Sequence, residues 1–107
     1  MEYTEGVRFD SLGLSPEIMR AIAQRNIEVS TPVQAGCIPP MMDWQDVIAK
    51  APTGTGKTFA YGIPIVEHID PEDESVQAVI LAPTRELAIQ ITDELREIGR
   101  ASCRERV

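Results

Sequence analysis

Asp-Val-Ile-Ala-Lys-Ala-Pro-Thr-Gly-Thr-Gly-Lys-Thr, residues 46–58, is the stretch that decides the fold of this chain. The short apolar run at 47–49 predicts a buried β-strand. A loop with two glycines follows it, and Lys57 and Thr58 then open a pattern typical of a helix. A strand, a glycine-containing loop and a helix in this order predict one unit of a parallel α/β sheet.

The loop has residue types that suit a bound phosphate. Glycines let backbone N–H groups face an anion, and the N-terminus of the following helix adds unpaired N–H groups. Lys57 is predicted to contact the β- and γ-phosphates of a nucleotide, and the Thr58 hydroxyl to bind Mg²⁺. The strict G-x-x-x-x-G-K-[ST] pattern requires glycine at position 51, where this chain has Ala51, so a chance turn is the alternative. The predicted site consists of Thr53, Gly54, Thr55, Gly56, Lys57 and Thr58.

Two helices are predicted before this unit. Ser15 is a suitable cap for a helix over residues 15–25, with a proline at its first position. The same cap-and-proline signal at Thr31 predicts a second, short helix, which the Pro-Pro pair at 39–40 should end. Trp44, in the link that follows, is interpreted as a cover over the edge of the core.

A helix, a strand and another helix are predicted after the phosphate loop. The first helix runs from Lys57 to about Ile69 and contains Pro64, which should kink it. The continuously apolar segment 76–82 predicts a strand covered on both faces. Apolar residues then recur at spacings of four, four and three over 85–98. This order is typical of a doubly wound parallel sheet.

Composition excludes several classes of protein. The hydrophobic fraction of 43% and the charged fraction of 25% are those of an ordinary soluble domain. No apolar run approaches the ~18 residues of a membrane span, so a cytoplasmic location is expected. A net charge of −7 argues against a broad basic face, although a narrow phosphate-binding strip remains open. Cys37 and Cys103 lack metal-ligand spacing and are expected to be free thiols, and His68 is expected to lie at a helix end.

Three motifs in a fixed order resemble the DEAD-box RNA helicases. The phosphate loop, Ala-Pro-Thr-Gly-Thr-Gly-Lys-Thr at 51–58, resembles motif I of that family. Pro-Thr-Arg-Glu-Leu-Ala at 83–88 matches motif Ia, and Ser-Thr-Pro-Val-Gln at 30–34 resembles the end of the Q motif. Phe9 stands where the family has an isolated upstream aromatic residue. The resemblance extends over residues 9–97.

The resemblance implies the fold, the cofactors and the function. We expect an incomplete RecA-like P-loop domain of the α/β class, with a parallel sheet and helices on both faces. The expected divisions are an N-terminal arm at 1–14, a partial first helicase domain at 15–97 and a tail at 98–107. ATP and Mg²⁺ are the implied cofactors, and RNA is the implied partner; no protein partner is indicated. The full-length protein would be an ATP-dependent RNA helicase.

The resemblance also assigns roles to single residues. Gln34 would recognise adenine, because an amide can donate to N7 and accept from N6. Phe9 and Ile27 would lie near the base, although the family usually has glycine and an aromatic ring where this chain has Asn26 and Ile27. Adenine recognition is therefore expected to be weaker. Contacts to the RNA backbone are implied for Pro83, Thr84 and Arg85.

The sequence contains no Asp-Glu-Ala-Asp, the family segment that holds Mg²⁺ and positions the attacking water. The 107 residues alone are therefore expected to bind nucleotide but barely hydrolyse it. Two alternatives stay open at this point. One is a non-catalytic nucleotide-binding fragment, and the other is a different P-loop enzyme such as a nucleotide kinase.

Residues 98–107, Ile-Gly-Arg-Ala-Ser-Cys-Arg-Glu-Arg-Val, differ in character from the acidic chain before them. They resemble the translation of a sequencing-adapter oligonucleotide. We expect this tail to be non-native and exclude it from the fold prediction. A genuine basic tail that touches RNA is the alternative.

Overall fold

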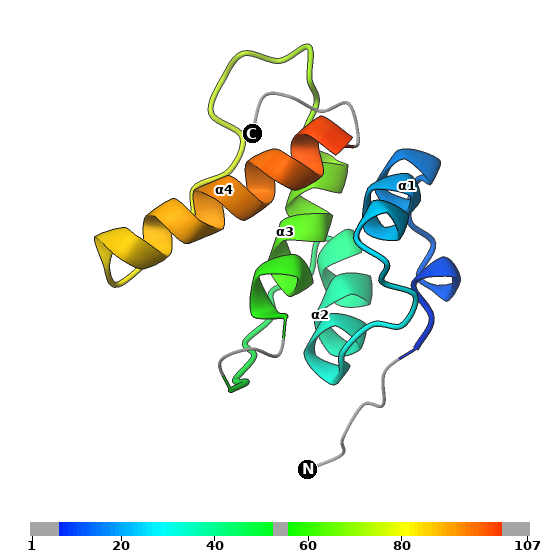
Figure 1. The fold of residues 1–107 in the computed structure, drawn as a ribbon. Coiled ribbons are helices and arrows are strands. Elements are labelled where there is room, and N and C mark those ends of the chain that lie inside the picture. Colours follow the sequence, from blue (N-terminus) through cyan, green and yellow to red (C-terminus); the bar gives the residue numbers. More distant parts are fainter. Residues whose placement is uncertain (1–6, 53–55, 102–107) are drawn as a thin grey trace.

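The computed structural model describes residues 7–52 and 56–101 (Figure 1). The described residues form a short 3₁₀-helix, η1 (Phe9–Ser11), and four α-helices. α2 and α3 pack side by side, α4 crosses α3, and α1 lies against α4 (Figure 1). The first turns of α4 extend away from this body. The bounds of the helices are α1 (Pro16–Gln24), α2 (Pro32–Met42), α3 (Lys57–His68) and α4 (Arg85–Ala101).

The first two helices begin where their sequences predict. The Ser15 hydroxyl caps α1 by accepting a hydrogen bond from the backbone N–H of Ile18 at 3.3 Å. Thr31 and Gln34 form a reciprocal capping box at the start of α2. Ser15 also donates its backbone N–H to the Glu67 carboxylate on α3, at 3.2 Å. The cap of α1 therefore also ties that helix to α3.

α2 continues through the proline pair that was predicted to end it. Pro39 and Pro40 both lie inside the helix, which ends at Met42. Proline has the φ angle of a helix, so its cost lies in the lost N–H and in crowding of the preceding turn. Ile38, beside the pair, is completely buried in the core. Burial of the Ile38 side of α2 against α3 offsets the cost of the two prolines. The predicted end of this helix at the proline pair was therefore wrong. α3 likewise continues through Pro64.

The core lies between the four helices and η1. Phe9, only 1% exposed, anchors the segment before α1 in this core. The apolar face predicted for α4 is confirmed over most of its length, although Leu87 at the start of this helix is partly exposed. Burial raises the pKa of the Cys37 thiol, so this cysteine acts as a small packing residue. The central cluster consists of Phe9, Ile18, Ile22, Ile38, Phe59, Ile63, Val66 and Ile98.

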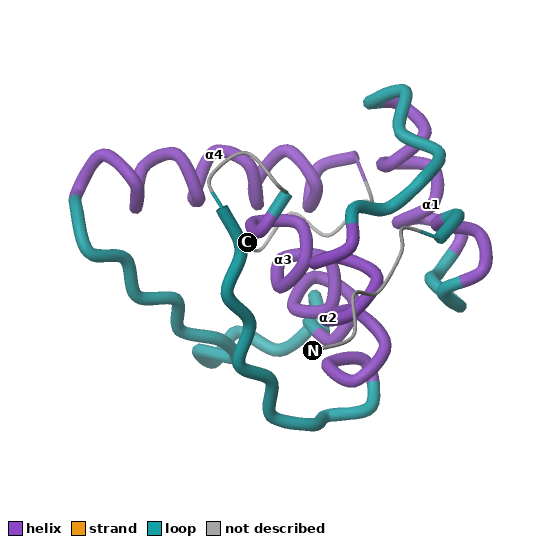
Figure 2. The backbone as a smooth tube through the Cα atoms, turned by 90° about the horizontal axis from the view of Figure 1, so that it is seen from below, coloured by secondary structure: helices purple, strands orange, loops and turns teal. Residues whose placement is uncertain are grey.

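The predicted parallel sheet is absent from the described residues. Figure 2 shows helices joined by loops, and the one strand-like pairing among the described residues is an isolated antiparallel bridge between Arg8 and Val29. The segments predicted as strands, 47–49 and 76–82, run as exposed loops, with Ile48 97% and Leu81 89% exposed. A strand needs a neighbour to pair its backbone groups, and the described residues offer none to either segment.

Two further expectations differ from the structure. Trp44 does not cover the core, because it is 77% exposed. α4 ends at Ala101, beyond its predicted end near residue 98, and Ile98 is buried. None of the helices in the described ranges combines the length and apolar character that a membrane span requires.

Asn26 has a left-handed backbone conformation, with φ 59°. Asparagine and glycine tolerate this conformation, whereas a β-branched residue does not. Replacing Asn26 by valine should lower the free energy of unfolding by about 1–2 kcal/mol, and replacing it by glycine should leave it nearly unchanged. Urea denaturation measures both values. Gln24→Val, on an exposed helical residue nearby, is the matched control, and an equal loss there would contradict the explanation.

Candidate nucleotide-binding site

The N-terminus of α3 presents backbone donors that have no partner among the described residues. Gly56 precedes the helix with φ 81° and ψ 30°, and no side chain among the described residues caps it. Lys57 is exposed at the first helical position, and Thr58 is half-buried beside it. The free N–H groups and the positive end of the helix dipole favour an anion here. Thr53, Gly54 and Thr55, predicted to complete the loop, lie outside the described residues.

Gln34 links α2 directly to this loop. Its amide Oε1 accepts a hydrogen bond from the backbone N–H of Thr31 at 2.9 Å, and its Nε2 donates to the carbonyl of Gly56 at 3.2 Å. The Gly56 carbonyl also accepts the first hydrogen bond of α3, from Ala60 at 3.1 Å. Gln34 is only 4% exposed. The amide predicted to recognise adenine therefore also holds the end of the phosphate loop.

Gly56 allows this close approach for two reasons. Its positive φ disfavours any residue with a side chain. A Cβ atom at this position would also lie 2.3 Å from Nε2 of Gln34, which is closer than non-bonded atoms can approach. The sequence predicted that glycine would be needed here, but did not indicate the contact with Gln34.

A hollow of about 810 Å³ opens in front of the α3 N-terminus. Gly56, Lys57 and Thr58 line one wall, and Gln90 and Ile91 of α4 line another. The exposed segment 79–81 borders the same space. The structure therefore places Gly56, Lys57 and Thr58 beside an open volume.

Arg25 also lines this hollow, and nothing in the neighbouring sequence marks it as a site residue. Its guanidinium lies 4.7 Å from the centroid of the Phe59 ring and 2.9 Å from the Glu97 carboxylate. These contacts join α1, α3 and α4 on one side of the site. Because Arg25, Phe59 and Glu97 are far apart in the sequence, no local sequence pattern predicts that they are in contact.

Phe9 and Ile27 lie deeper than a nucleotide-contacting role would suggest. Phe9 is buried in the core, and Ile27 is half-buried and packs against the same cluster. The backbone of Val7 accepts hydrogen bonds from Ser30, both from its N–H at 2.8 Å and from its hydroxyl at 2.7 Å. The segment before α1 is thus fastened to the segment that leads into α2. The predicted contact of Phe9 and Ile27 with adenine remains a prediction.

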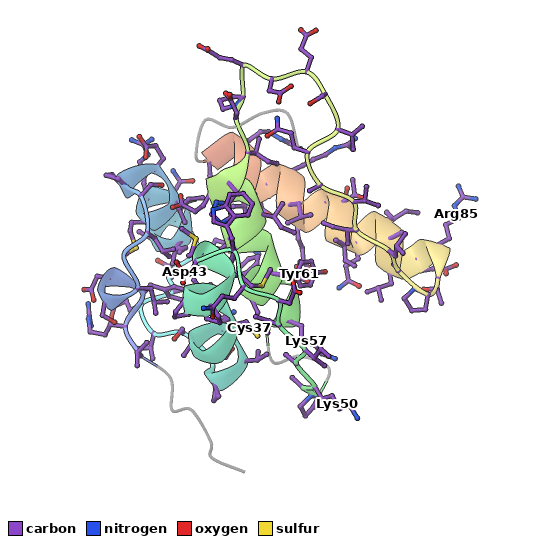
Figure 3. All side chains as sticks on the ribbon, turned by 180° about the vertical axis from the view of Figure 1, so that it is seen from behind. Cys37, Asp43, Lys50, Lys57, Tyr61 and Arg85 are labelled. Carbon is purple, nitrogen blue, oxygen red and sulfur yellow. The ribbon has the colours of Figure 1, made fainter. Side chains whose placement is uncertain are left out.

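Pro83, Thr84 and Arg85 lie at the start of α4, and none of them lines the hollow beside Lys57. The Thr84 hydroxyl accepts a hydrogen bond from the N–H of Leu87 at 3.2 Å, so it caps α4. Arg85 lies at the outer tip of α4, whereas Lys50 and Lys57 lie together near the loop (Figure 3). The structure therefore does not bring the predicted RNA-binding residues together with the predicted ATP-binding residues.

Comparison with known proteins identifies relatives of this chain. The model of the DEAD/DEAH box helicase family matches residues 31–107. The chain is 54% identical over 91 residues to the DEAD-box ATP-dependent RNA helicase CshA of Geobacillus kaustophilus, covering 85% of this chain and 20% of that protein. The ATP-dependent RNA helicase CshA of Limosilactobacillus reuteri is 47% identical over 94 residues, which are 88% of this chain and 19% of that protein. The chain spans about a fifth of the length of these relatives.

Solved structures of DEAD-box proteins share the fold. A DEAD box protein from Methanococcus jannaschii matches with a TM-score of 0.80 and 38% identity, over 85% of this chain and 25% of that one. Saccharomyces cerevisiae Dbp5 bound to RNA and ADP BeF3 matches with a TM-score of 0.82 and 35% identity, over 88% of this chain and 25% of that one. These neighbours are RecA-like domains, which supports the predicted fold class. The parallel sheet included in that prediction is not confirmed by the described residues of this chain. The chain belongs to the DEAD/DEAH box helicase family.

Proposed function

We propose that this chain is the nucleotide-binding front portion of an ATP-dependent RNA helicase. The observation that carries the proposal is the 3.2 Å hydrogen bond from the Gln34 amide to the Gly56 carbonyl. It joins the side chain suited to adenine to the loop suited to phosphate. A nucleotide that contacts both would therefore meet two parts of one connected site.

The start of α3 would hold the phosphate end of ATP. The uncapped N–H groups and the exposed Lys57 ammonium complement the negative charge of the β- and γ-phosphates. The Thr58 hydroxyl, one residue further into the helix, would contribute a ligand to Mg²⁺. Bound Mg²⁺ would neutralise charge on the phosphates. Thr53, Gly54 and Thr55 would complete the backbone cradle.

Gln34 keeps enough hydrogen-bonding capacity for adenine. Its amide nitrogen has two hydrogens and its oxygen has two lone pairs, and the structure uses one of each. The remaining N–H can donate to adenine N7, and the remaining lone pair can accept from the N6 amino group. Guanine presents an acceptor where adenine has that amino group, so Gln34 would favour ATP over GTP.

The start of α4 would contact RNA. Pro83, Thr84 and Arg85 lie exposed at this helix N-terminus, which offers N–H groups and a guanidinium to a phosphate. The names of the relatives and the RNA-bound Dbp5 structure support this assignment. Such contacts hold the RNA backbone and do not read its sequence.

Turnover would require groups that these 107 residues do not contain. The sequence has no Asp-Glu-Ala-Asp, whose carboxylates would hold Mg²⁺ and orient the attacking water. The chain alone would bind nucleotide, and the whole protein would couple hydrolysis to the unwinding of RNA.

A chimaeric helicase tests the proposal. Residues 1–97 would replace the matching segment of the Geobacillus kaustophilus CshA protein, which supplies the rest of a helicase. We expect RNA-stimulated ATP hydrolysis and unwinding of a short RNA duplex. Lys57→Ala should lower the hydrolysis rate at least about 100-fold, as loss of a charge-stabilising donor does in other enzymes.

Lys50→Ala is the matched control, because Lys50 is a second exposed lysine near the loop (Figure 3). It should leave hydrolysis nearly unchanged. Full activity of a correctly folded Lys57→Ala chimaera, or equal hydrolysis of GTP and ATP, would contradict the proposal. A chimaera that unwinds DNA but not RNA would contradict the assigned substrate.

Ile27→Phe should tighten ATP binding by the chimaera. An aromatic ring at this position could stack on adenine, which an aliphatic side chain cannot do, and such stacking contributes about 0.5–1.5 kcal/mol. The expected fall in Kd is therefore about twofold to tenfold. Titration with a fluorescent ATP analogue measures it. Ile27→Leu controls for the change in packing, and unchanged affinity in the phenylalanine variant would rule out a contact with the base.

A further inference from the structure

An exposed tryptophan ring lies on a half-buried histidine ring at the opposite end of α3 from Gly56. Trp44, the single tryptophan of the chain, stacks on His68, with 3.8 Å between ring centroids and 27° between ring planes. His68 belongs to the last turn of α3, and its Nε2 lies 3.1 Å from the carbonyl oxygen of Met41 in α2. Both helices therefore support one face of the tryptophan, and its high exposure leaves the other face open.

The backbone of Trp44 is strained. Its φ is 61°, in the left-handed region where glycine or asparagine is favoured and a large side chain is not. Folding does not require a tryptophan here, because the ring does not enter the core. A strained and exposed aromatic residue supported by a stacked partner indicates a role in binding.

The surroundings of this ring pair are acidic. Trp44, His68 and Asp46 line a hollow of about 320 Å³ that has no lysine or arginine in its lining. Asp43 directly precedes Trp44, and neither Asp43 nor Asp46 belongs to any ion pair found among the described residues. The open ring face is thus accompanied by two carboxylates without a cationic partner.

We propose that this face binds an arginine side chain from a basic segment of a partner protein. A guanidinium can stack on the open face of Trp44 while its N–H groups donate to the carboxylates of Asp46 or Asp43. The ammonium of lysine is a point charge and lacks the planar surface for stacking. An RNA phosphate would meet the same carboxylates and be repelled. The site is separate from the proposed nucleotide site, because the two lie at opposite ends of α3.

Peptide binding by the 107-residue chain carrying Val79→Lys and Leu81→Lys, two charges that should keep it monomeric, tests the proposal. The probe is a fluorescein-labelled peptide of four Arg-Gly repeats, followed by fluorescence anisotropy, and the emission of Trp44 is read in parallel with unlabelled peptide. We expect saturable binding that changes the Trp44 emission and weakens as salt is added. A peptide with citrulline in place of arginine, which keeps the shape without the charge, should bind at least about tenfold more weakly.

Two variants of the chain provide the controls. Trp44→Asn keeps a residue suited to the left-handed turn and should weaken binding of the labelled peptide about tenfold. Asp43→Asn with Asp46→Asn should weaken it about fivefold. Equal binding by either variant would overturn the proposal. So would preferential binding of oligouridylate at this ring, or a change in Trp44 emission that depends only on the concentration of the chain, since the occupant would then be RNA or a second copy.

Discussion

The isolated chain should self-associate, and lysine at positions 79 and 81 should make it monomeric. Residues 76–82, Val-Gln-Ala-Val-Ile-Leu-Ala, form an uncharged apolar segment without proline or glycine. Val79 and Leu81 are exposed, and within the described residues this segment makes no backbone-to-backbone hydrogen bond. An exposed apolar segment with free backbone groups pairs readily with the same segment of another copy.

Val79→Lys with Leu81→Lys would block this pairing by placing two like charges on one face of the segment. Sedimentation velocity should show aggregates or oligomers for the parent chain and a single monomeric species for the variant. Ala23→Lys with Gln24→Lys adds the same charge to exposed positions of α1 and should not dissolve the oligomers. A monomeric parent chain, or equal solubility of the two variants, would contradict this origin of the association.

The starts of the helices could be predicted because their causes are local. Ser15 and Thr31 cap the helices that follow them within three residues, and the cap-and-proline signal is visible in the sequence. The apolar spacing of α3 and α4 likewise records which side each helix buries. The end of α2 was missed because burial of Ile38, which the sequence does not quantify, outweighs the cost of two prolines.

The two predicted strands are not confirmed among the described residues, because a strand depends on a partner. The apolar runs at 47–49 and 76–82 have the composition of buried strands, yet neither has a neighbour among the described residues. The sequence pattern reports what a segment would bury and says nothing of what pairs with its backbone.

Part of the candidate site followed from the motifs, and part depended on contacts between distant residues. Gly56, Lys57 and Thr58 lie at a helix N-terminus as predicted. The hydrogen bond from Gln34 to Gly56 had no local signal. Asn26, which departs from the family pattern, has the left-handed conformation that glycine also favours, so the departure preserves the turn.

Gly56→Ala should have the largest effect on stability of the single substitutions considered, because it disturbs two features at once. An alanine in the left-handed conformation costs about 1–2 kcal/mol. The added Cβ would also lie 2.3 Å from Nε2 and 3.1 Å from Cδ of Gln34, so this buried amide would have to move and lose its hydrogen bond. A buried polar group without its partner costs a further ~1–3 kcal/mol. ATP affinity should fall as well, since the loop and Gln34 are displaced together.

Gly13→Ala separates the two costs. Gly13 has φ 72°, close to the 81° of Gly56, and a Cβ added there would meet nothing within 4 Å. Urea denaturation of the monomeric lysine variant should therefore show the backbone cost alone for Gly13→Ala and a larger loss for Gly56→Ala. In a Gln34→Ala background the collision is removed, because the next atom, Thr31 Cγ2, lies at an ordinary 3.5 Å. Gly56→Ala should then cost about as much as Gly13→Ala. An unchanged cost in that background would show that Gln34 does not support the loop and would remove the observation on which the proposed nucleotide site rests.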